Sequence, residues 1–323
     1  MRDRDFIYRL NPQWSAKTVR ITKAGGQTNR NYVVTHKNKK FFVRLPWETD
    51  VINRTIEGKN ILALSKNKKL ASVLPTYHCY ILGKKDILNQ KDKNVFLVPD
   101  GTMVAQYIQG KEYSLELFEN KKYQKLLAQA FYAFHTSGVR FVNIYDVFRD
   151  ETEKYRVAAQ KHFLKDIVTP KTIAVFRNLE QQAKKKLMSI KKGVPTHNDF
   201  IFQNFLVGKN SKVYLSDFEY AGMNRRGGIC YDFGFLFADN LFRKPAITKN
   251  LFEQFLSVAD KVYKRKLDRE QVYAASQAVI IMQFWWGILR YGTVKTKKEK
   301  QYFAKYIQAR AKKAQELAKT LQM

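Results

Sequence analysis

The chain has 323 residues, of which 45% are hydrophobic and 14% are aromatic, and its formal net charge is +31. This length and composition predict a folded globular protein with a substantial core, arranged as one large domain or two lobes. Cys79 and Cys230 stand far apart and outside any C-x-x-C pattern, which argues against a disulfide framework and a zinc site. The first ten residues have no apolar region of a secretory signal, so the cytoplasm is the expected location.

The large positive charge comes from lysines that are scattered in short clusters, such as 66–69, 184–186 and 295–300. No arginine-rich arm, zinc finger or RNP-like aromatic motif accompanies them, so nucleic acid is a disfavoured partner. We interpret the lysines as a solvated basic surface, with an anionic membrane face as an alternative. Such a surface also raises the local concentration of polyanions such as ATP within a screening distance of about 8 Å.

The N-terminal third of the chain is rich in short β-prone runs. The sequence AGGQTN at 24–29 predicts a turn between two of them, because its glycines permit close approach of the backbone. A near-helical spacing of Ile and Leu residues predicts one helix within 51–65. This part should therefore form a small sheet and one helix. The predicted strands are residues 18–21, 31–35, 41–45, 95–99 and 102–108.

After Gly110 the apolar spacing becomes helical over most of the chain. The segment 271–291 is apolar nearly all round, which predicts a helix at the centre of a second lobe. Its longest apolar run, 278–289, contains Gln283 and is shorter than the roughly 18 residues of a membrane span, so no transmembrane segment is expected. The final segment has one apolar face and predicts a docked C-terminal helix, with a membrane-surface helix as the alternative. The other predicted helices are one ending near Gly138, 172–190 and 251–263.

An antiparallel hairpin is predicted between Asn204 and Asp217. Apolar runs at 205–207 and 213–215 flank the turn-forming sequence GKNS. Asn204 and Asp217 lie symmetrically about that turn, so they are expected to be neighbours at its open end, with Cβ atoms about 5 Å apart if directly paired. Two oxygen ligands at that spacing suit Mg²⁺, which usually keeps waters and substrate phosphates in its shell.

Asp199 lies shortly before Asn204, on an irregular segment that leads into the hairpin. The pattern H-x-D-x-x-x-x-N, followed by a hairpin and D-F, is typical of phosphoryl transfer. In that chemistry the first Asp accepts a hydroxyl proton, while the Asn and the second Asp bind metal. An isolated Asp is more often a cap or turn residue, but the three residues in register favour catalysis. His197 alone is interpreted as structural.

Several details distinguish this pattern from that of a protein kinase. The chain has HND instead of HRD, DFE instead of DFG, no A-P-E motif, and GGQTNRNY instead of G-x-G-x-x-G. The segments AGGQTNRNYVV, FFVRLP, HNDFIFQN and SDFEYAGMNRRGGICYDFG resemble those of the aminoglycoside phosphotransferase-like small-molecule kinases. Within that group the chain is most similar to the choline/ethanolamine kinase branch, and the resemblance extends to FHTSG at 134–138 and to the helix around Trp286.

The resemblance implies an α+β, two-lobed protein-kinase-like fold. A small N-terminal antiparallel sheet lobe would span 1–108 and bind nucleotide, and a larger, mainly helical C-terminal lobe would span 109–323 and carry the catalytic and substrate-binding residues. The implied cofactors are ATP and Mg²⁺, with Asp199 as catalytic base and Asn204 and Asp217 as metal ligands. The implied acceptor is the hydroxyl of a small alcohol, choline or ethanolamine. Related acceptors (an aminoglycoside, thiamine or a sugar) and a basic nucleic-acid-binding protein with a relict kinase fold are the alternatives.

The resemblance also implies residues that bind the nucleotide and the acceptor. Arg44 would contact the nucleotide phosphates, with Glu57 orienting it. Leu289 stands one helical turn after Trp286, where this branch commonly has a second Trp, so the aromatic cage for choline is incomplete. The implied nucleotide-binding residues, from the glycine loop to the hinge that holds adenine, are Gly25, Gly26, Thr28, Asn29, Arg44, Glu57, Gln106 and Ile108. The implied acceptor-site residues are Glu219, Tyr220, Asp232, Trp286 and Tyr291.

Overall fold

The computed structural model describes residues 2–25, 29–46, 52–89, 95, 97–162, 168–187, 189–243 and 249–321. The chain forms two compact units, each built from three stretches of sequence. The division into consecutive lobes at residues 108 and 109 stays a prediction. Unit 1 comprises Met1–Tyr113, Thr136–Asn143 and Gln203–Ala221, and unit 2 comprises Ser114–His135, Ile144–Phe202 and Gly222–Met323.

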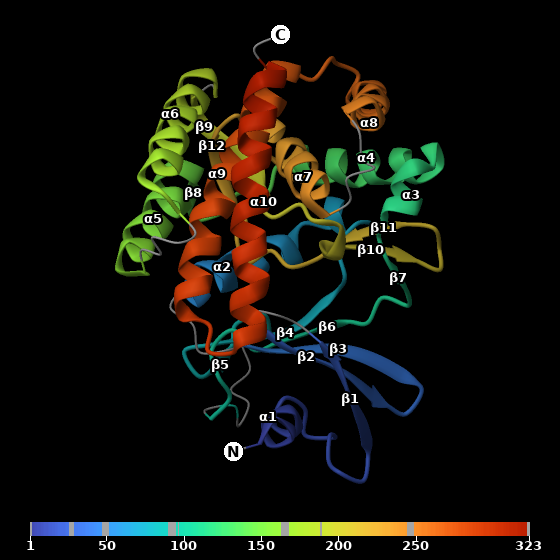
Figure 1. Ribbon diagram of the computed structural model, residues 1–323. Helices are drawn as coiled ribbons and strands as arrows, with labels where there is room; N and C mark the ends of the chain where they lie inside the picture. The colour runs from blue at the N-terminus through green and yellow to red at the C-terminus, as the bar shows by residue number, and fades with distance from the viewer. Residues whose placement is uncertain are drawn as a thin grey trace. The chain divides into compact units, whose positions relative to one another are not determined.

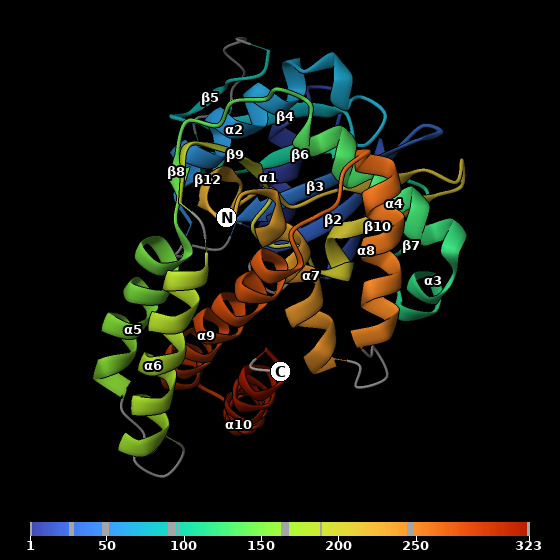
Figure 2. The same cartoon turned by 90° about the horizontal axis from the view of Figure 1, so that it is seen from above.

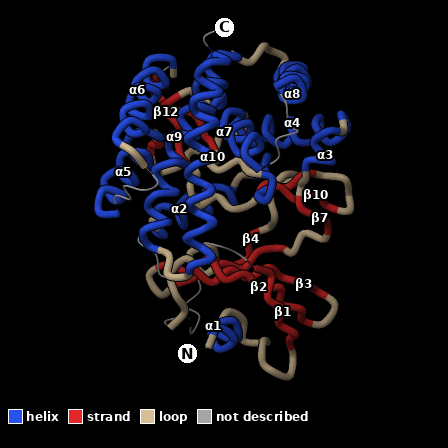
Figure 3. The backbone as a smooth tube through the Cα atoms, in the orientation of Figure 1, coloured by secondary structure: helices blue, strands red, loops and turns tan. Residues whose placement is uncertain are grey.

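Unit 1 contains a six-stranded antiparallel sheet with the order β1-β2-β3-β6-β4-β5 (Figure 1). The three predicted strands nearest the N-terminus are confirmed as β1 to β3. Val34 and Val43 are fully buried in a core that also contains Ile7 and Trp14. The N-terminal helix α1, Asp3–Arg9, therefore packs against this sheet (Figure 3). The strands are β1 Val19–Gly25, β2 Asn29–His36, β3 Lys39–Pro46, β4 Tyr77–Leu82, β5 Lys85–Asp86 and β6 Met103–Gln106.

The predicted strand at 95–99 is wrong. None of the described residues in this range lies in a strand, and the N–H of Val98 donates to the carbonyl of Val95 at 2.8 Å, which closes a turn. Pro99 has no N–H with which to continue a strand ladder. Val95 and Val98 are nevertheless buried in the core of the sheet, so their apolar character reflects a packed loop. The place beside β6 is taken by β4, which the sequence did not predict.

A second sheet of unit 1 has the order β11-β10-β7. It confirms the predicted hairpin, because β10 pairs antiparallel with β11 and Phe205 lies opposite Leu215. The predicted helix within 51–65 is confirmed as α2, Arg54–Lys66, and the side chain of Asn53 caps it by accepting two backbone N–H groups of the first turn. The strands of the second sheet are β7 Gly110–Glu112, β10 Phe205–Gly208 and β11 Val213–Leu215.

Unit 2 is mainly helical and is organised around α9, Arg269–Thr293, which contacts α5, α6, α7 and α10 (Figure 2). This confirms the central helix that the sequence predicts. By length and composition α9 is able to cross a membrane. However, 89% of its apolar stretch of 18 residues is buried inside the structure, as in the core helix of a folded protein. The other helices of unit 2 are α3 Leu115–Glu119, α4 Lys121–His135, α5 Lys154–Ala159, α6 Pro170–Lys186, α7 Ile229–Arg243, α8 Lys249–Tyr263 and α10 Lys297–Leu321, with a π-helix at Phe148–Glu153 and 3-10 turns elsewhere.

A small sheet of unit 2 has the order β8-β12-β9. It corrects the predicted helix at 172–190, because α6 ends at Lys186 and Ser189 already begins β9. The final helix is confirmed as docked, since α10 packs on α9 and buries Phe303 and Ile307. The strands of this sheet are β8 Ile144–Tyr145, β9 Ser189–Thr196 and β12 Gly222–Arg226.

Candidate active site

The open end of the β10–β11 hairpin carries the two predicted metal ligands of unit 1. Because Phe205 pairs with Leu215, the next position opposite Asn204 is Ser216, and Asp217 lies one residue further along. The N–H and the hydroxyl of Ser216 both donate to the carbonyl of Asn204, at 2.9 and 3.0 Å. The symmetrical placement of Asn204 and Asp217 about the turn is therefore off by one residue, although both residues lie at the same end of the hairpin.

Asp217 has an unusual backbone conformation. Its φ is +62°, in the left-handed region that costs free energy for a residue with a Cβ atom. The next residue, Phe218, is buried and anchors the chain. The Asp217 side chain is about one-third exposed, and within the described part of the chain its Oδ1 atom accepts no hydrogen bond. A carboxylate oxygen held in this way retains capacity for a cation.

Arg44 forms an ion pair with Asp217. It lies on the central strand β3, and its Nη1 atom is 3.6 Å from Oδ1 of Asp217. Its Nη2 atom lies 2.5 Å from Oε1 of Glu57 and donates to the carbonyl of Gly101 at 3.2 Å. The contact that the predicted orienting role of Glu57 requires is therefore present, and it directs the guanidinium toward the end of the hairpin.

Glu57 is held as a carboxylate by several donors. Its Oε2 atom accepts hydrogen bonds from Tyr80 at 2.7 Å and from Arg54 at 2.8 Å. Burial alone would raise the pKa of Glu57, but the charges of Arg44 and Arg54 outweigh burial and keep this pKa below its ordinary value. The sequence analysis did not identify Arg54, whose position three residues before Glu57 on α2 is a signal for such a pair.

Arg54 also joins Glu57 to the segment after the hairpin. Its Nη1 atom is 3.6 Å from Oε2 of Glu219, and its Nη2 atom donates to Oδ1 of Asn29 at 2.9 Å. Asn29 in turn donates to Glu219 at 3.2 Å. Burial, followed by the charge of Asp217, raises the pKa of Glu219 to about 8. We call Arg44, Arg54, Glu57, Asp217 and Glu219 the arginine–carboxylate cluster.

The other predicted nucleotide-binding residues are placed as follows. Gly25 ends β1 with a φ of +84°, whereas Gly26 and Thr28 lie outside the described residues. Gln106 ends β6, and its side-chain oxygen accepts the N–H of Thr76 at 3.3 Å. Ile108 follows in the connection to β7. The roles of the glycine loop and of the hinge in nucleotide binding stay predictions.

In unit 2, the loop that carries Asp199 is held by Asp232. The N–H groups of His197 and Asn198 donate to the two carboxylate oxygens of Asp232, at 3.0 and 2.9 Å. His135, which the sequence analysis did not single out although it belongs to the FHTSG segment, places Nε2 2.9 Å from Oδ2 of Asp232. Asp232 is fully buried and braces the loop, and its part in the acceptor site stays a prediction.

Asn198 adds a second restraint to the same loop. Its φ is +65°, and its side-chain oxygen accepts hydrogen bonds from Thr196 at 2.7 Å and from Asn224 on β12 at 3.1 Å. These contacts fix the backbone on the N-terminal side of Asp199, which is partly exposed. A carboxylate on a fixed loop is suited to accept a proton from a bound group.

The three aromatic residues predicted for the acceptor site each have their own neighbouring side chains or burial. Trp286 on α9 makes edge contacts with Phe303 and Tyr306 of α10, with ring centroids 5.6 and 5.5 Å apart. The ammonium of Lys300 lies 5.9 Å from the ring centroid of Tyr291. Tyr220 is half-buried in the segment that follows Glu219. Their part in binding a cation stays a prediction.

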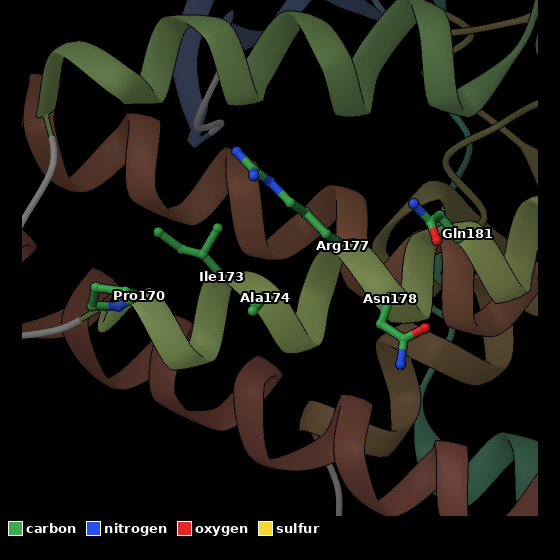
Figure 4. Close-up of a pocket in the computed structure, with 6 residues that line it drawn as sticks. All are labelled: Pro170, Ile173, Ala174, Arg177, Asn178 and Gln181. Carbon is green, nitrogen blue, oxygen red and sulfur yellow. The ribbon is translucent and has the colours of Figure 1, made fainter.

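A cavity of about 490 Å³ lies along α6 in unit 2 (Figure 4). None of the predicted site residues lines it, so it is separate from the residues assigned to phosphoryl transfer. For a metal, the described residues contain no cluster of three or more His, Cys, Asp or Glu side chains with suitable geometry. A Mg²⁺ ion held by two protein ligands together with phosphates and waters does not require such a cluster. The cavity is lined by Pro170, Ile173, Ala174, Arg177, Asn178 and Gln181.

Comparison with known proteins decides the family. The choline/ethanolamine kinase family model matches residues 89–318, which is more than half of the chain. The chain belongs to this family. The braced Asp199 loop, the β10–β11 hairpin, α9 and all but the last three residues of α10 lie within the matched residues. No curated protein sequence matches the chain.

Solved structures share the fold of this choline/ethanolamine kinase family member. A choline/ethanolamine kinase family protein from Mesorhizobium loti is 19% identical, with a TM-score of 0.69 over 98% of this chain and 94% of that one. The choline kinase LicA from Streptococcus pneumoniae is 20% identical, with a TM-score of 0.69 over 94% of each chain, and has also been solved in complex with AMP. An aminoglycoside phosphotransferase from Alicyclobacillus acidocaldarius is 16% identical, with a TM-score of 0.57 over 96% of this chain and 93% of that one. The predicted α+β, protein-kinase-like fold is thereby confirmed.

Proposed function

We propose that the protein is an ATP-dependent phosphotransferase that phosphorylates the hydroxyl of a small alcohol, most readily choline or ethanolamine. The family match supports a small-molecule kinase. The observation that carries the proposal is the arrangement in unit 1, where the Arg44–Glu57 pair reaches Asp217 at the end of the hairpin beside Asn204. The proposed location is the cytoplasm, where ATP is available.

In the proposed reaction, the residues of unit 1 bind and orient the phosphate donor. Arg44 would contact the phosphates, since Glu57 holds its guanidinium in a fixed direction. Asn204 and Asp217 would hold Mg²⁺, which neutralises charge on the transferring phosphate when it is bound. The oxygen atoms of the two side chains are the ligand type that Mg²⁺ prefers, and Oδ1 of Asp217 has capacity for it.

In unit 2, Asp199 would accept the proton of the acceptor hydroxyl. Asp232 and Asn198 fix the loop before it, so the carboxylate is positioned before the acceptor arrives. The proton moves from the hydroxyl oxygen to a carboxylate oxygen of Asp199 as the new O–P bond forms and the bond to the ADP oxygen breaks.

Choline is the first proposed acceptor and ethanolamine the second. Leu289 in place of a second Trp weakens the case for a quaternary ammonium, because each good aromatic contact contributes about 0.5–2 kcal/mol to binding such a group. A related kinase for an aminoglycoside, thiamine or a sugar is the second candidate function, and the aminoglycoside phosphotransferase with the same fold favours it.

A coupled assay of ADP release over choline, ethanolamine, thiamine and aminoglycosides tests the proposal. We expect choline or ethanolamine to stimulate ADP release in the presence of Mg²⁺ and to give the corresponding phosphate ester. The Asp199→Asn variant is the negative control, since it retains the bulk of the side chain but not the base. Turnover of another alcohol alone would retain the kinase and remove the choline assignment, and no turnover with any alcohol would contradict the proposal.

A further inference from the structure

A second cavity, of about 290 Å³, lies in unit 1 on the sheet face that packs against α1. On this face Val43 of β3 shares a core with Trp14, whereas the next residue, Arg44, contacts Glu57 of α2. Because neighbouring side chains of a strand point to opposite faces, the cavity and the arginine–carboxylate cluster lie on opposite faces of the sheet. Figure 1 shows α1 and α2 on opposite sides of this sheet. The residues that line the cavity, which include none of the predicted site residues, are Leu10, Asn11, Trp14, Phe41, His78, Cys79, Asn89 and Val104.

The strand β4 is irregular where it borders this cavity. Its register with β6 shifts between Tyr77 and Cys79, so His78 is an extra residue in the ladder. In a regular strand His78 would share a face with Tyr80, whose hydroxyl donates to α2 on the other side of the sheet. A bulge changes the direction of a side chain, and the ring centroid of His78 lies 5.7 Å from that of Phe41, with the two planes 72° apart. The bulge therefore places an imidazole ring in the wall of the cavity.

The lining offers aromatic surface, one hydrogen-bond donor and one acceptor. The rings of Trp14 and Phe41 lie 5.4 Å apart between centroids. Trp14 is only 4% exposed, and its indole N–H has no hydrogen-bond partner among the described residues. A buried donor without a partner is rare in proteins. The side-chain nitrogen of Asn89 donates to the carbonyl of His78 and to Asp86, each at 2.7 Å, which leaves the side-chain oxygen of Asn89 as its group for a ligand.

The cavity is uncharged, although the protein has a net charge of +31. Apart from His78, none of the described residues that line it is acidic or basic. Burial lowers the pKa of His78 below its ordinary value of 6.5, so this ring is mainly neutral at pH 7. A charged ligand would lose its hydration here without gaining a counter-charge. A cavity of about 150 Å³ takes benzene, so about twice that volume has room for two fused rings.

We propose that this cavity binds an uncharged nitrogen heteroaromatic ligand of two fused rings, such as a benzimidazole. A ring nitrogen of the ligand accepts the N–H of Trp14, and an N–H group of the ligand donates to the side-chain oxygen of Asn89. The rings of Trp14, Phe41 and His78 supply the apolar contact. This ligand site is additional to those for the nucleotide and the acceptor, so it does not depend on the proposed function.

Isothermal titration of the full chain with benzimidazole and with indole at pH 7 tests the inference. The two molecules have the same shape, but indole lacks the ring nitrogen that accepts the N–H of Trp14. We therefore expect benzimidazole to bind about tenfold more tightly than indole. The 1-methyl derivative of benzimidazole has no N–H group to donate to Asn89, and it should also bind about tenfold more weakly than benzimidazole.

Two variants separate the Trp14 donor from a general loss of a buried indole. Trp14→Phe keeps an aromatic ring but removes the N–H group, so benzimidazole and indole should bind this variant with equal affinity. Trp285→Phe is the matched control, because Trp285 is also buried and its N–H also has no partner among the described residues, but it lies on α9 in unit 2. Trp285→Phe should bind both molecules as wild type does, and an equal loss of benzimidazole affinity in the two variants would overturn the inference.

Two further measurements on the wild-type protein locate the bound molecule. The affinity for benzimidazole should be unchanged when ADP and Mg²⁺ are present, whereas competition would place benzimidazole in the nucleotide site and overturn the inference. Of the five histidines, His78 lines the cavity, so its imidazole NMR signals should shift on binding. Absence of binding, equal affinities for benzimidazole and indole, or unchanged His78 signals would each overturn the inference. These wild-type results are decisive even if Trp14→Phe fails to fold.

Discussion

Replacing Glu57 by Gln tests whether its buried ion pair with Arg44 supports unit 1. The Glu57 side chain has no exposed surface. It forms an ion pair with Arg44 at 2.5 Å and accepts hydrogen bonds from Tyr80 at 2.7 Å and Arg54 at 2.8 Å. Gln keeps the shape of the side chain but removes its charge, which leaves the buried guanidinium of Arg44 without its closest counter-charge. Breaking a buried pair in this way costs about 3–5 kcal/mol, so we expect the free energy of unfolding to fall by about that amount at pH 7.

Glu219→Gln is the matched control for Glu57→Gln. Glu219 belongs to the same arginine–carboxylate cluster, but its pKa of about 8 leaves it mainly neutral at pH 7. Gln then replaces a side chain of the same charge and shape, and the expected loss is below about 1 kcal/mol. Urea denaturation followed by circular dichroism measures both losses, provided that the dependence of the free energy of unfolding on urea concentration has the same slope in all the proteins. Equal losses of unfolding free energy in the two variants would refute the assignment of an ionised Glu57 and a neutral Glu219 at pH 7.

The raised pKa of Glu219 predicts how the stability of Glu219→Gln and of the wild-type protein should differ with pH. Because the folded protein raises the pKa of Glu219, the folded state binds the proton more tightly than the unfolded state does. The resulting contribution to stability is lost as pH rises through about 8. We therefore expect Glu219→Gln to lose less stability than wild type between pH 6 and pH 9 in the same denaturation experiment, and a parallel decline would contradict the raised pKa.

Further predictions concern the proposed reaction. Asp199→Asn should lower kcat by on the order of 10²–10⁴ with nucleotide affinity unchanged, and a rate within threefold of wild type would remove Asp199 from the mechanism. Asp217→Ala should abolish turnover and Asn204→Ala should raise the Mg²⁺ concentration needed for half-maximal rate; unchanged Mg²⁺ titrations would show that neither residue binds the ion. Trp286→Ala should raise KM for choline with KM for ATP unaffected, and Leu289→Trp should lower KM for choline. If steady-state kinetics show that these substitutions change only KM for ATP, the Trp286 ring does not lie in the choline site.

The elements that local sequence determines were predictable. The β10–β11 hairpin follows from two apolar runs around GKNS, and α2 follows from its Ile and Leu spacing. The register was predicted with an error of one residue, since Ser216 takes the position opposite Asn204. Counting outward from the ends of a turn does not fix the pairing, because the turn's own hydrogen bonds set which residues face each other.

Elements that depend on distant partners were not predictable. The strand β9 contains Lys191, Lys192 and Gly193, a sequence that reads as the end of a charged helix, and it becomes a strand only by pairing with β12 later in the chain. Likewise, the contacts of Arg54 with Glu219 and of His135 with Asp232 join segments far apart in sequence, although the local pair of Arg54 and Glu57 follows from their spacing on α2. Their residue types alone say nothing of those partners.

The three aspartates of the candidate site show how donor contacts separate the roles of identical side chains. Asp232 is fully buried, and its two oxygens receive two backbone N–H groups besides the ring of His135, so its capacity for further ligands is used within unit 2. The Asp217 side chain as a whole is one-third exposed. Its Oδ1 atom is buried, accepts no hydrogen bond among the described residues and has Nη1 of Arg44 3.6 Å away as its ion-pair partner. A carboxylate saturated by hydrogen-bond donors stabilises a loop, whereas one with an oxygen that accepts no hydrogen bond keeps lone pairs with which to bind a cation. Asp199, partly exposed on the loop that Asp232 fixes, combines a positioned backbone with exposure to solvent, which are two features that its proposed role as base requires.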